Sequence, residues 1–304
     1  MHWRECLRIG INHHLLYAGQ VDPPRAHAET LLPLLADPRF EVVDLWIPAE
    51  AAVAAREIAA CRDCGKIVVY NVGSRQGQPP PEPASLEPAV WQRSLDFYRA
   101  ELDRAVAAGA AKVVTNSGPD QPAARPAAIE QLVRFYQALC RHVPPEVTLL
   151  IEPTDRTLHK RKLIGPSLEA AALCRRLWAE GSANFASMID MGHVPLLGET
   201  LAQAFEDSAG CIGHVHFGNC IRRNPQHPLF GDKHVPWGIA EGEYGVAAVA
   251  EFLGRGRAAG YFAQAHRGTA SFEMRPYAEL GPAASLERFF SLLDEAWSAG
   301  AAGQ

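Results

Sequence analysis

The segment FASMIDMGHV, residues 185–194, shows the pattern that decides the fold of this chain. In this segment an apolar run ends at a charged side chain, and a glycine and other loop residues follow within a few positions. Similar patterns recur in TLLIEPTD (148–155), IGHVHFGN (212–219) and ASFEMRP (270–276). Short apolar runs that end in polar residues, Gly or Pro indicate buried parallel strands that lead into loops.

Eight strands of this kind are expected, each about five to eight residues long and rich in Val, Ile, Leu or aromatic residues. They lie at 7–12, 40–47, 66–72, 111–117, 147–153, 185–191, 211–217 and 271–275. Stretches with apolar residues at a roughly 3.6-residue spacing predict helices between and after the strands. These helices are expected at 23–36, 49–63, 88–108, 126–142, 167–180, 199–209, 245–259 and 284–298.

Eight alternations of strand and helix predict an α/β fold, a single (β/α)8 TIM barrel that spans residues 1–304. A doubly wound open sheet is the alternative, but it would place functional residues on two or three strands at a switch point. Two long loops, 73–87 and 218–245, are expected at the C-terminal mouth, where barrel enzymes keep their active sites. Loops of this length in a compact domain are usually functional.

The composition argues against nucleic-acid and membrane partners. The formal net charge of −5 provides no general attraction to nucleic acid or to acidic membranes. No apolar run approaches the roughly 18 residues that span a bilayer, and residues 1–12 lack the apolar core of a signal peptide. The seven scattered cysteines do not indicate a disulfide framework. We therefore expect a cytoplasmic protein, and the long 218–245 loop is compatible with a homodimer.

Four ligand-type side chains lie at or near the ends of the fifth to eighth predicted strands: Glu152, Asp190, His216 and Glu273. Each of them alone has an ordinary structural explanation, such as an Asp that caps the next helix. In a barrel, however, the ends of these strands converge on one mouth, so the four side chains can meet at a single ion. Three carboxylates and one imidazole suit Mn²⁺, Mg²⁺ or Co²⁺. The set predicts metal-assisted chemistry on an oxygenated small molecule at the C-terminal mouth.

The segments IDMGHV, GHVHFGNCIRR and FEMRP resemble the xylose isomerase-like barrel superfamily, and within it the ketose 3-epimerases and related sugar isomerases. The resemblance is sharpest over residues 148–275. It implies that the four side chains hold one divalent ion, with Mn²⁺ preferred and Mg²⁺, Co²⁺ or Zn²⁺ as alternatives. His216 is the second histidine of the His-x-His motif. The first, His214, is expected to face the opposite side of its strand as a buried, hydrogen-bonded histidine.

The resemblance implies a metal-dependent isomerase or epimerase that acts on a small-molecule carbohydrate, a keto-sugar or sugar derivative. A divalent ion beside the ketone would stabilise the enediolate that forms when the neighbouring carbon loses a proton. Glu152 and Glu273 are the expected proton carriers, one removing a proton and the other returning one. The expected substrate-binding residues are His193, Arg222, Asn71, Asn116 and Arg275.

Two positions depart from the epimerase pattern. Leu158 stands where the epimerases have a further glutamate six residues after the first ligand, and Arg275 replaces an apolar substrate contact. Basic residues also follow the fifth strand, at Lys160 and Arg161. The loss of an acid and the gain of bases favour a substrate other than a plain ketohexose. A carboxylated, phosphorylated, cyclic or glycosidic keto-sugar would fit.

Three alternatives remain open on the sequence. A lyase or dehydratase could act by β-elimination on a keto-polyol or 3-keto-glycoside with the same ligands. An endonuclease IV-like repair enzyme would need a multi-zinc cluster and a basic face, whereas this chain shows one ligand set and a net negative charge. A catalytically silent barrel is disfavoured by the intact ligand set.

Overall fold

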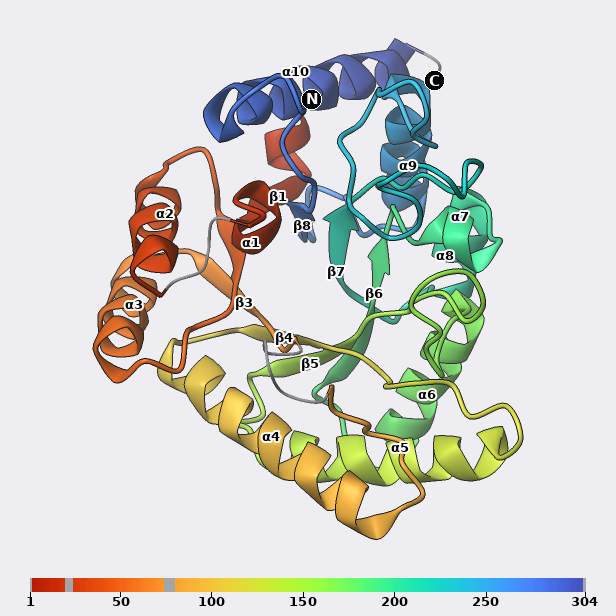
Figure 1. Cartoon of the computed structure of the whole chain (residues 1–304). Coiled ribbons are helices and arrows are strands. Elements are labelled where there is room, and N and C mark those ends of the chain that lie inside the picture. The colour runs from red at the N-terminus through yellow and green to blue at the C-terminus, as the bar shows by residue number, and fades with distance from the viewer. Residues whose placement is uncertain (1, 20–23, 74–79, 303–304) are drawn as a thin grey trace.

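The computed structural model describes residues 2–19, 24–73 and 80–302, and its eight parallel strands close into a barrel in the order β1 to β8 (Figure 1). Barrel closure joins β1 to β8, with Leu7 opposite Gly268. The strands are β1 (Leu7–Asn12), β2 (Val42–Leu45), β3 (Ile67–Asn71), β4 (Lys112–Thr115), β5 (Thr148–Ile151), β6 (Phe185–Asp190), β7 (Ile212–Phe217) and β8 (Gly268–Phe272). The predicted (β/α)8 barrel is confirmed, and the open sheet is excluded.

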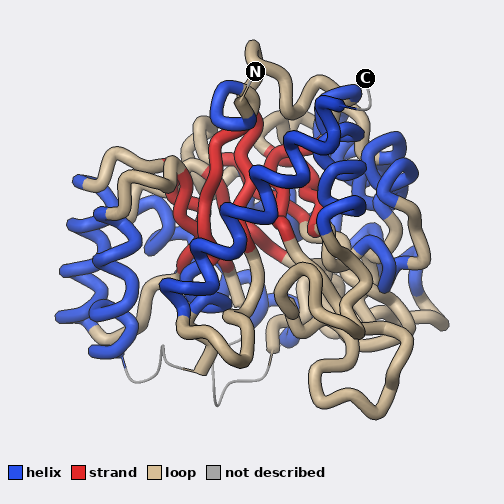
Figure 2. Tube along the Cα trace, turned by 90° about the horizontal axis from the view of Figure 1, so that it is seen from above, coloured by secondary structure: helices blue, strands red, loops and turns tan. Residues whose placement is uncertain are grey.

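Helices surround the barrel and cover the outward faces of its strands (Figures 1 and 2). The longer ones are α2 (Pro24–Ala36), α3 (Ala51–Asp63), α4 (Pro88–Ala107), α5 (Arg125–Cys140), α6 (Ser167–Ala179), α8 (Leu201–Asp207), α9 (Val246–Ala258) and α10 (Pro282–Ala302). They fall where the apolar spacing predicts them. Three short helices were not predicted, because three or four residues are too few to show a periodicity: η1 (Trp3–Glu5), α1 (His13–Leu16) and α7 (Val194–Leu197).

The core lies in two layers. Inside the barrel, small and medium apolar side chains fill the interior: Val42, Val69, Val114, Leu150, Ala186 and Met188. Two larger apolar clusters fill the space between the strands and the surrounding helices. Gly10 of β1 permits closure, because a Cβ there would lie 2.4 Å from Ser271 Oγ and 2.6 Å from Val42 Cβ. Any side chain at this position would push β1 away from its neighbours.

The eighth strand differs from its predicted bounds. The apolar run 271–275 predicts a strand there, but β8 is Gly268–Phe272. The start Gly-Thr-Ala has a weak strand signal, yet β1 provides parallel partners from Leu7 onward. Pairing with the neighbouring strand therefore decides the register, and Glu273 comes directly after the strand rather than within it.

The longest described loop, residues 218–245, joins β7 to α9 and contains only isolated bridges, such as Ile221 with Gly231. Of the predicted 73–87 loop, residues 74–79 lie outside the described residues. Figure 2 shows that long loops gather at one end of the barrel. Among the helices that the structure describes, none is both long enough and apolar enough to cross a membrane.

Candidate metal centre

Glu152, Asp190, His216 and Glu273 meet at the C-terminal ends of β5 to β8. Glu152 follows β5, Asp190 ends β6, His216 lies in β7 and Glu273 follows β8. Each offers one ligand atom, and these atoms all lie within 4.8 Å of one another. The shortest approach is 2.6 Å between His216 Nδ1 and Glu273 Oε2, and His216 Nδ1 is 3.5 Å from Glu152 Oε1. The fold therefore brings together the four side chains that the sequence singles out.

The atoms of this cluster fit a divalent metal ion. Glu152 Oε1, Asp190 Oδ2, His216 Nδ1 and Glu273 Oε2 are all buried and form no hydrogen bond of good geometry, although ion-pair contacts such as that between Asp190 Oδ2 and His193 Nε2 at 3.1 Å surround them. Buried polar atoms are normally paired, because an unpaired one costs free energy. Three carboxylate oxygens and one imidazole nitrogen match the ligand preferences of Mn²⁺, Mg²⁺, Co²⁺ or Zn²⁺. A divalent ion would satisfy all four atoms at once.

In Asp190 and Glu273, the second carboxylate oxygen accepts a hydrogen bond from a neighbouring residue. Asp190 Oδ1 accepts a hydrogen bond from the backbone N–H of Gly192 at 2.7 Å. Glu273 Oε1 accepts one from Asn12 Nδ2 at 2.9 Å. Gly218 leaves room for Asp190, because a Cβ at Gly218 would lie 2.4 Å from Asp190 Oδ1. One oxygen of each carboxylate is thus anchored while the other faces the shared centre.

His216 is oriented from below by Asp44 of β2, a residue that the sequence reasoning missed. The Nε2 of His216 lies 3.0 Å from Asp44 Oδ1. A carboxylate can only accept, so Nε2 carries a proton, and Nδ1 is the nitrogen that would bind an ion at the centre. Ser271 of β8 donates a hydrogen bond to the other oxygen of Asp44. The only sequence signal for this role was a carboxylate in the middle of the largely apolar run of residues 40–47.

The predicted orientation of His214 is wrong. His214 Nε2 lies 3.3 Å from the same Asp44 Oδ1 that contacts His216, so both histidines face the barrel interior. Side chains alternate along a strand, and residues two positions apart therefore share a face. His214 is buried and hydrogen-bonded as expected, with its Nδ1 2.8 Å from Thr269 Oγ1.

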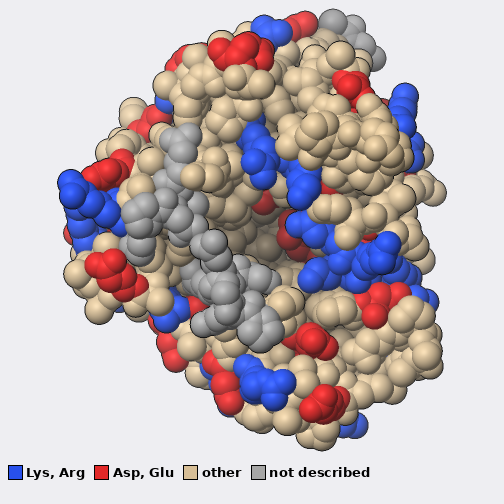
Figure 3. Space-filling model, viewed as in Figure 1, with Lys and Arg blue, Asp and Glu red and all other residues tan. Residues whose placement is uncertain are grey.

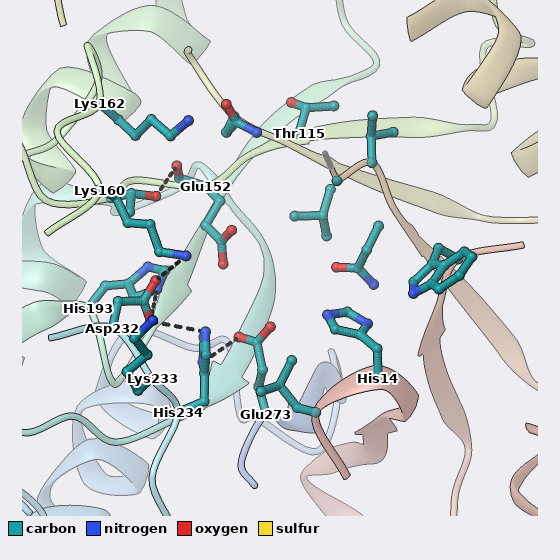
Figure 4. Close-up of a pocket in the computed structure, with 18 of the residues that line it drawn as sticks. His14, Thr115, Glu152, Lys160, Lys162, His193, Asp232, Lys233, His234 and Glu273 are labelled. Carbon is teal, nitrogen blue, oxygen red and sulfur yellow. Dashed lines mark hydrogen bonds and ion pairs between the residues drawn. The ribbon is translucent and has the colours of Figure 1, made fainter. Parts of the chain in front are cut away.

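A second cluster of His193, Asp232 and His234 adjoins the first (Figure 4). Asp232 Oδ1 lies 3.2 Å from His193 Nε2 and 3.0 Å from His234 Nε2. His193, His234 and Asp190 also offer ligand atoms within 4.8 Å of one another. The sequence predicts one ligand set, whereas the structure shows a further group of ligand-type side chains beside it. The missed signal was the Asp-x-His of GDKH (231–234) inside the long loop.

Both clusters open into a cavity of about 970 Å³ at the barrel mouth. Four predicted substrate-binding residues line it together with Glu152 and Glu273: His193, Asn71, Asn116 and Arg275. The fifth, Arg222, lies elsewhere, with its side chain 42% exposed and its Nε 3.3 Å from Glu243 Oε2. Leu158 is 43% exposed and is not part of the cavity wall formed by the described residues, whereas Lys160 and Lys162 of the same loop are.

A family model described as "Xylose isomerase-like TIM barrel" matches residues 36–288. The chain belongs to the xylose isomerase-like TIM barrel family. No curated protein sequence matches it significantly.

Solved structures share this barrel at low sequence identity. An L-ribulose 3-epimerase superposes with a TM-score of 0.68 and 17% identity over 98% of each chain. The 3-keto-D-glucoside 4-epimerase of E. coli has a TM-score of 0.64 and 16% identity, covering 94% of this chain and 98% of its own. A family 2 AP endonuclease from Brucella melitensis has a TM-score of 0.65 and 17% identity, covering 94% and 98%. At these identities the likeness shows the fold alone.

In this xylose isomerase-like barrel, charges at the mouth compensate one another. Burial raises the pKa of Asp190 to about 7, and the neighbouring Glu273 adds to the effect against the pull of His193. Burial opposes the charge on His234, but Asp232 and Glu273 outweigh it and raise its pKa to about 9. The pKa of His193 is also raised, because Asp190 and Asp232 outweigh its burial. Without a metal ion, the carboxylates are therefore balanced by protonated imidazoles.

Proposed function

We propose that this protein is a divalent-metal-dependent isomerase or epimerase of a keto-sugar or sugar derivative. The observation that carries the proposal is a set of four buried ligand atoms that lie within 4.8 Å of one another beneath the cavity and form no hydrogen bond of good geometry: Glu152 Oε1, Asp190 Oδ2, His216 Nδ1 and Glu273 Oε2. Two structural neighbours, an L-ribulose 3-epimerase and a 3-keto-D-glucoside 4-epimerase, support the same reaction class.

The metal ligands in this proposal are Glu152, Asp190, His216 and Glu273, with Mn²⁺ as the preferred ion. When bound, the ion would stabilise the negative charge that develops as a carbon next to a ketone loses its proton. A cavity of about 970 Å³ can hold a monosaccharide and a further substituent.

Glu152 and Glu273 are the proposed proton carriers. Their carboxylates point toward the same space from different sides of the cavity (Figure 4). One removes the proton from the reacting carbon and the other returns a proton to the product. Asn12 anchors one oxygen of Glu273, so this carboxylate holds a constant position.

His193, Asn71, Asn116 and Arg275 are the proposed substrate-binding residues on the cavity wall. The Nδ1 of His193 lies 3.0 Å from the carbonyl oxygen of Pro153, which holds the ring beside Asp190. The amides of Asn71 and Asn116 offer both donors and acceptors, which suit a hydroxyl-rich molecule.

The test is exchange of substrate hydrogen in D₂O by the Mn²⁺-loaded protein, with a panel of keto-sugars. We expect deuterium at one carbon of a product whose formula is otherwise unchanged. Glu152→Gln and Glu273→Gln should each lower the rate by about 10²- to 10⁴-fold. The matched control is Glu169→Gln, which removes a carboxylate that pairs with Arg156. Full exchange by both active-site variants would rule out the assigned roles.

A β-eliminating lyase is the second candidate, and the raised pKa of His234 favours it. A protonated His234 lies at the cavity wall, with its Nδ1 3.6 Å from Glu273 Oε2. This imidazolium could donate a proton to a departing hydroxyl or alkoxide. Loss of water or an alcohol from the product would identify the lyase, whereas an unchanged formula identifies the isomerase.

The cluster of His193, Asp232 and His234 also keeps an endonuclease-type activity open, because it could hold a further ion beside the first. An isomerase and an endonuclease differ in the number of metal ions per chain and in substrate. One ion per chain and no cleavage of DNA with an abasic site would exclude the nuclease. No bound divalent ion and no effect of Glu152→Gln on any assay would indicate a silent barrel.

A further inference from the structure

We propose that the substrate carries an anionic group, a carboxylate or a phosphate, and that Lys162, Lys233 and Arg275 supply its countercharge. This inference rests on the proposed function, because it concerns the substrate of the same cavity. It extends that function by naming the anionic group that distinguishes this substrate from a neutral ketose.

The cavity wall is divided by charge. Among the residues that the structure describes, the ends of β1 to β4 and the loops after them contribute uncharged or apolar side chains to the wall, such as Trp46, Val72 and Asn116, together with His14, whose pKa burial lowers to about 4. The loops after β5, β7 and β8 contribute the cations: Lys160, Lys162, Lys233 and Arg275. Figure 3 shows Lys and Arg atoms gathered along one side of the hollow, with Asp and Glu atoms toward its floor.

One of the four cations already has a partner. Lys160 Nζ lies 3.1 Å from Asp232 Oδ2. In contrast, Lys162 Nζ, Lys233 Nζ and the terminal guanidinium nitrogens of Arg275 have no hydrogen bond or salt bridge to any residue that the structure describes. Three cationic groups therefore border the cavity with their charges uncompensated by a carboxylate of the wall.

The backbone holds these cations in place. The N–H of Lys162 donates to the carbonyl of Asp155 at 3.0 Å, which fixes the loop after β5. The backbone N–H of Arg275 donates to the carbonyl of His234 at 2.7 Å, and its Nε donates to the carbonyl of Lys233 at 2.9 Å. Lys233 and Arg275 are thus adjacent, although they come from different loops. A site that is organised before the ligand arrives loses less entropy on binding.

The charge balance of the centre also favours an anion. Among the described residues, four carboxylates lie at the centre or on the wall, Glu152, Asp190, Asp232 and Glu273, and four side-chain cations line the same cavity. With the ionised Asp44 beside His216 counted as well, a divalent ion leaves a net charge of +1 before any imidazole is counted. Burial lowers the pKa of Lys162, and the nearby Lys160 adds to this effect. An anion beside Lys162 would counteract both contributions.

The test compares matched ligands on the Mn²⁺-loaded protein by calorimetry: a neutral ketohexose, its phosphate ester and the corresponding keto-uronic acid. Inorganic phosphate is the minimal probe. We expect at least one anionic ligand to bind about tenfold or more tightly than the neutral ketose, because one well-placed charged contact is worth about a factor of ten. Its affinity should fall as salt is added. The phosphate and carboxylate arms identify which anion the site takes.

Lys162→Gln, Lys233→Gln and Arg275→Gln assign the contribution of each cation. At least one of these variants should weaken binding of the anionic ligand about tenfold, and Lys162→Gln and Lys233→Gln should leave binding of the neutral ketose unchanged. The control is Arg223→Gln, which removes an exposed cation that pairs with Glu243 outside the cavity. Equal binding of neutral and anionic ligands, or equal losses for both in every variant, would overturn the proposal.

The calorimetric binding experiment and the hydrogen-exchange experiment test the anion site and the isomerase independently. If anionic ligands bind through these cations but no sugar exchanges hydrogen in D₂O, the anion site stands and the isomerase is wrong. If neutral ketoses are converted well and no anionic ligand binds more tightly than they do, the isomerase stands and the anion site is wrong.

Discussion

At the residue scale, Asp44 shows how a single buried carboxylate prepares a ligand for a metal ion. It is fully buried, yet His214 and His216 hold its pKa well below the usual range against the effect of burial. It therefore stays ionised and accepts from His216 Nε2, which leaves Nδ1 free to bind. Ser271 holds the second oxygen of Asp44, so the orientation of the carboxylate is determined from two strands.

Asp44→Asn should weaken metal binding. An asparagine can present its NH₂ group to His216 Nε2 and so favour the tautomer whose Nδ1 carries the proton. Loss of a partner that orients a ligand usually lowers metal affinity by about 10- to 100-fold. The measurement is calorimetric titration of the metal-free protein with Mn²⁺. Thr269→Val is the control, because Thr269 contacts His214 rather than His216, and a similar loss in this control would contradict the assignment.

At the element scale, the loop after β5 takes its shape from one side chain. The carboxylate of Asp155 is buried and accepts hydrogen bonds from the backbone N–H groups of Leu158, His159 and Lys160 at 2.6, 2.6 and 2.7 Å. These bonds explain why Leu158 faces solvent while Lys160 reaches the cavity. The path of the loop therefore keeps Leu158, which stands where the epimerases have a glutamate, out of the cavity wall.

Asp155→Ala should loosen this loop and destabilise the protein. Three backbone N–H groups would lose their acceptor, with an expected loss in free energy of unfolding on the order of 3 kcal/mol. Hydrogen exchange should become faster at residues 158–160, and urea unfolding would measure the loss in stability. Asp155→Asn, which keeps one acceptor oxygen, should lose less. Unchanged exchange at these three amides in the alanine variant would contradict the account.

Lys112 joins three strands across the barrel. Its Nζ donates to the carbonyl of Gly213 in β7 at 2.6 Å and to Thr269 Oγ1 in β8 at 2.7 Å. Burial lowers its pKa to about 8 from the ordinary 10.5, although Asp44 opposes the shift. Between these two values the unfolded chain binds more protons at this residue than the folded protein, so the contribution of Lys112 to stability rises with pH.

Comparison of the wild type with Lys112→Met isolates this contribution. The difference in free energy of unfolding, wild type minus variant, should increase by on the order of 2 kcal/mol between pH 7.5 and 10. Urea denaturation at intervals of pH provides the measurement. A difference that stays constant or falls over this range would show that the pKa of Lys112 is not lowered by folding.

At the scale of the whole molecule, barrel closure brings the candidate metal centre together. Its four proposed ligands come from four strands in succession, and the parallel direction of those strands brings their C-terminal ends to one mouth. The two large apolar clusters around the barrel hold these ends in place against the repulsion of the buried carboxylates. An ion at this centre would bind only the folded state and would therefore stabilise the whole barrel.

Removal of metal should lower the midpoint of thermal unfolding. At an ion concentration 100 times the dissociation constant, binding adds about 2.7 kcal/mol to the stability of the folded state. For a chain of this size, that is a shift of about 4 °C. Calorimetry with Mn²⁺ and with EDTA measures it. Glu273→Gln should lose most of the shift and Glu169→Gln should keep it, and a shift equal in both variants would place the ion elsewhere.

The amino-acid sequence by itself determined the barrel and the four candidate ligands. Both depend on local properties, namely the spacing of apolar residues and the position of a polar side chain at the end of an apolar run. For this reason Glu152, Asp190, His216 and Glu273 could be singled out before their geometry was known. The bounds of β8 were less predictable, because pairing with β1 extends this strand back to Gly268.

Only the tertiary structure decided the surroundings of those ligands. Asp44 and His216 are 172 residues apart in the chain, and no local pattern links them. Asp232 and His234 lie in a long irregular loop without a periodicity that would orient them, and Arg222 of the same loop pairs with Glu243 instead of reaching the cavity. Such contacts depend on the path of each loop and on barrel closure. Local periodicity therefore determined which strands supply the centre, and three-dimensional packing decided which side chains orient and surround it.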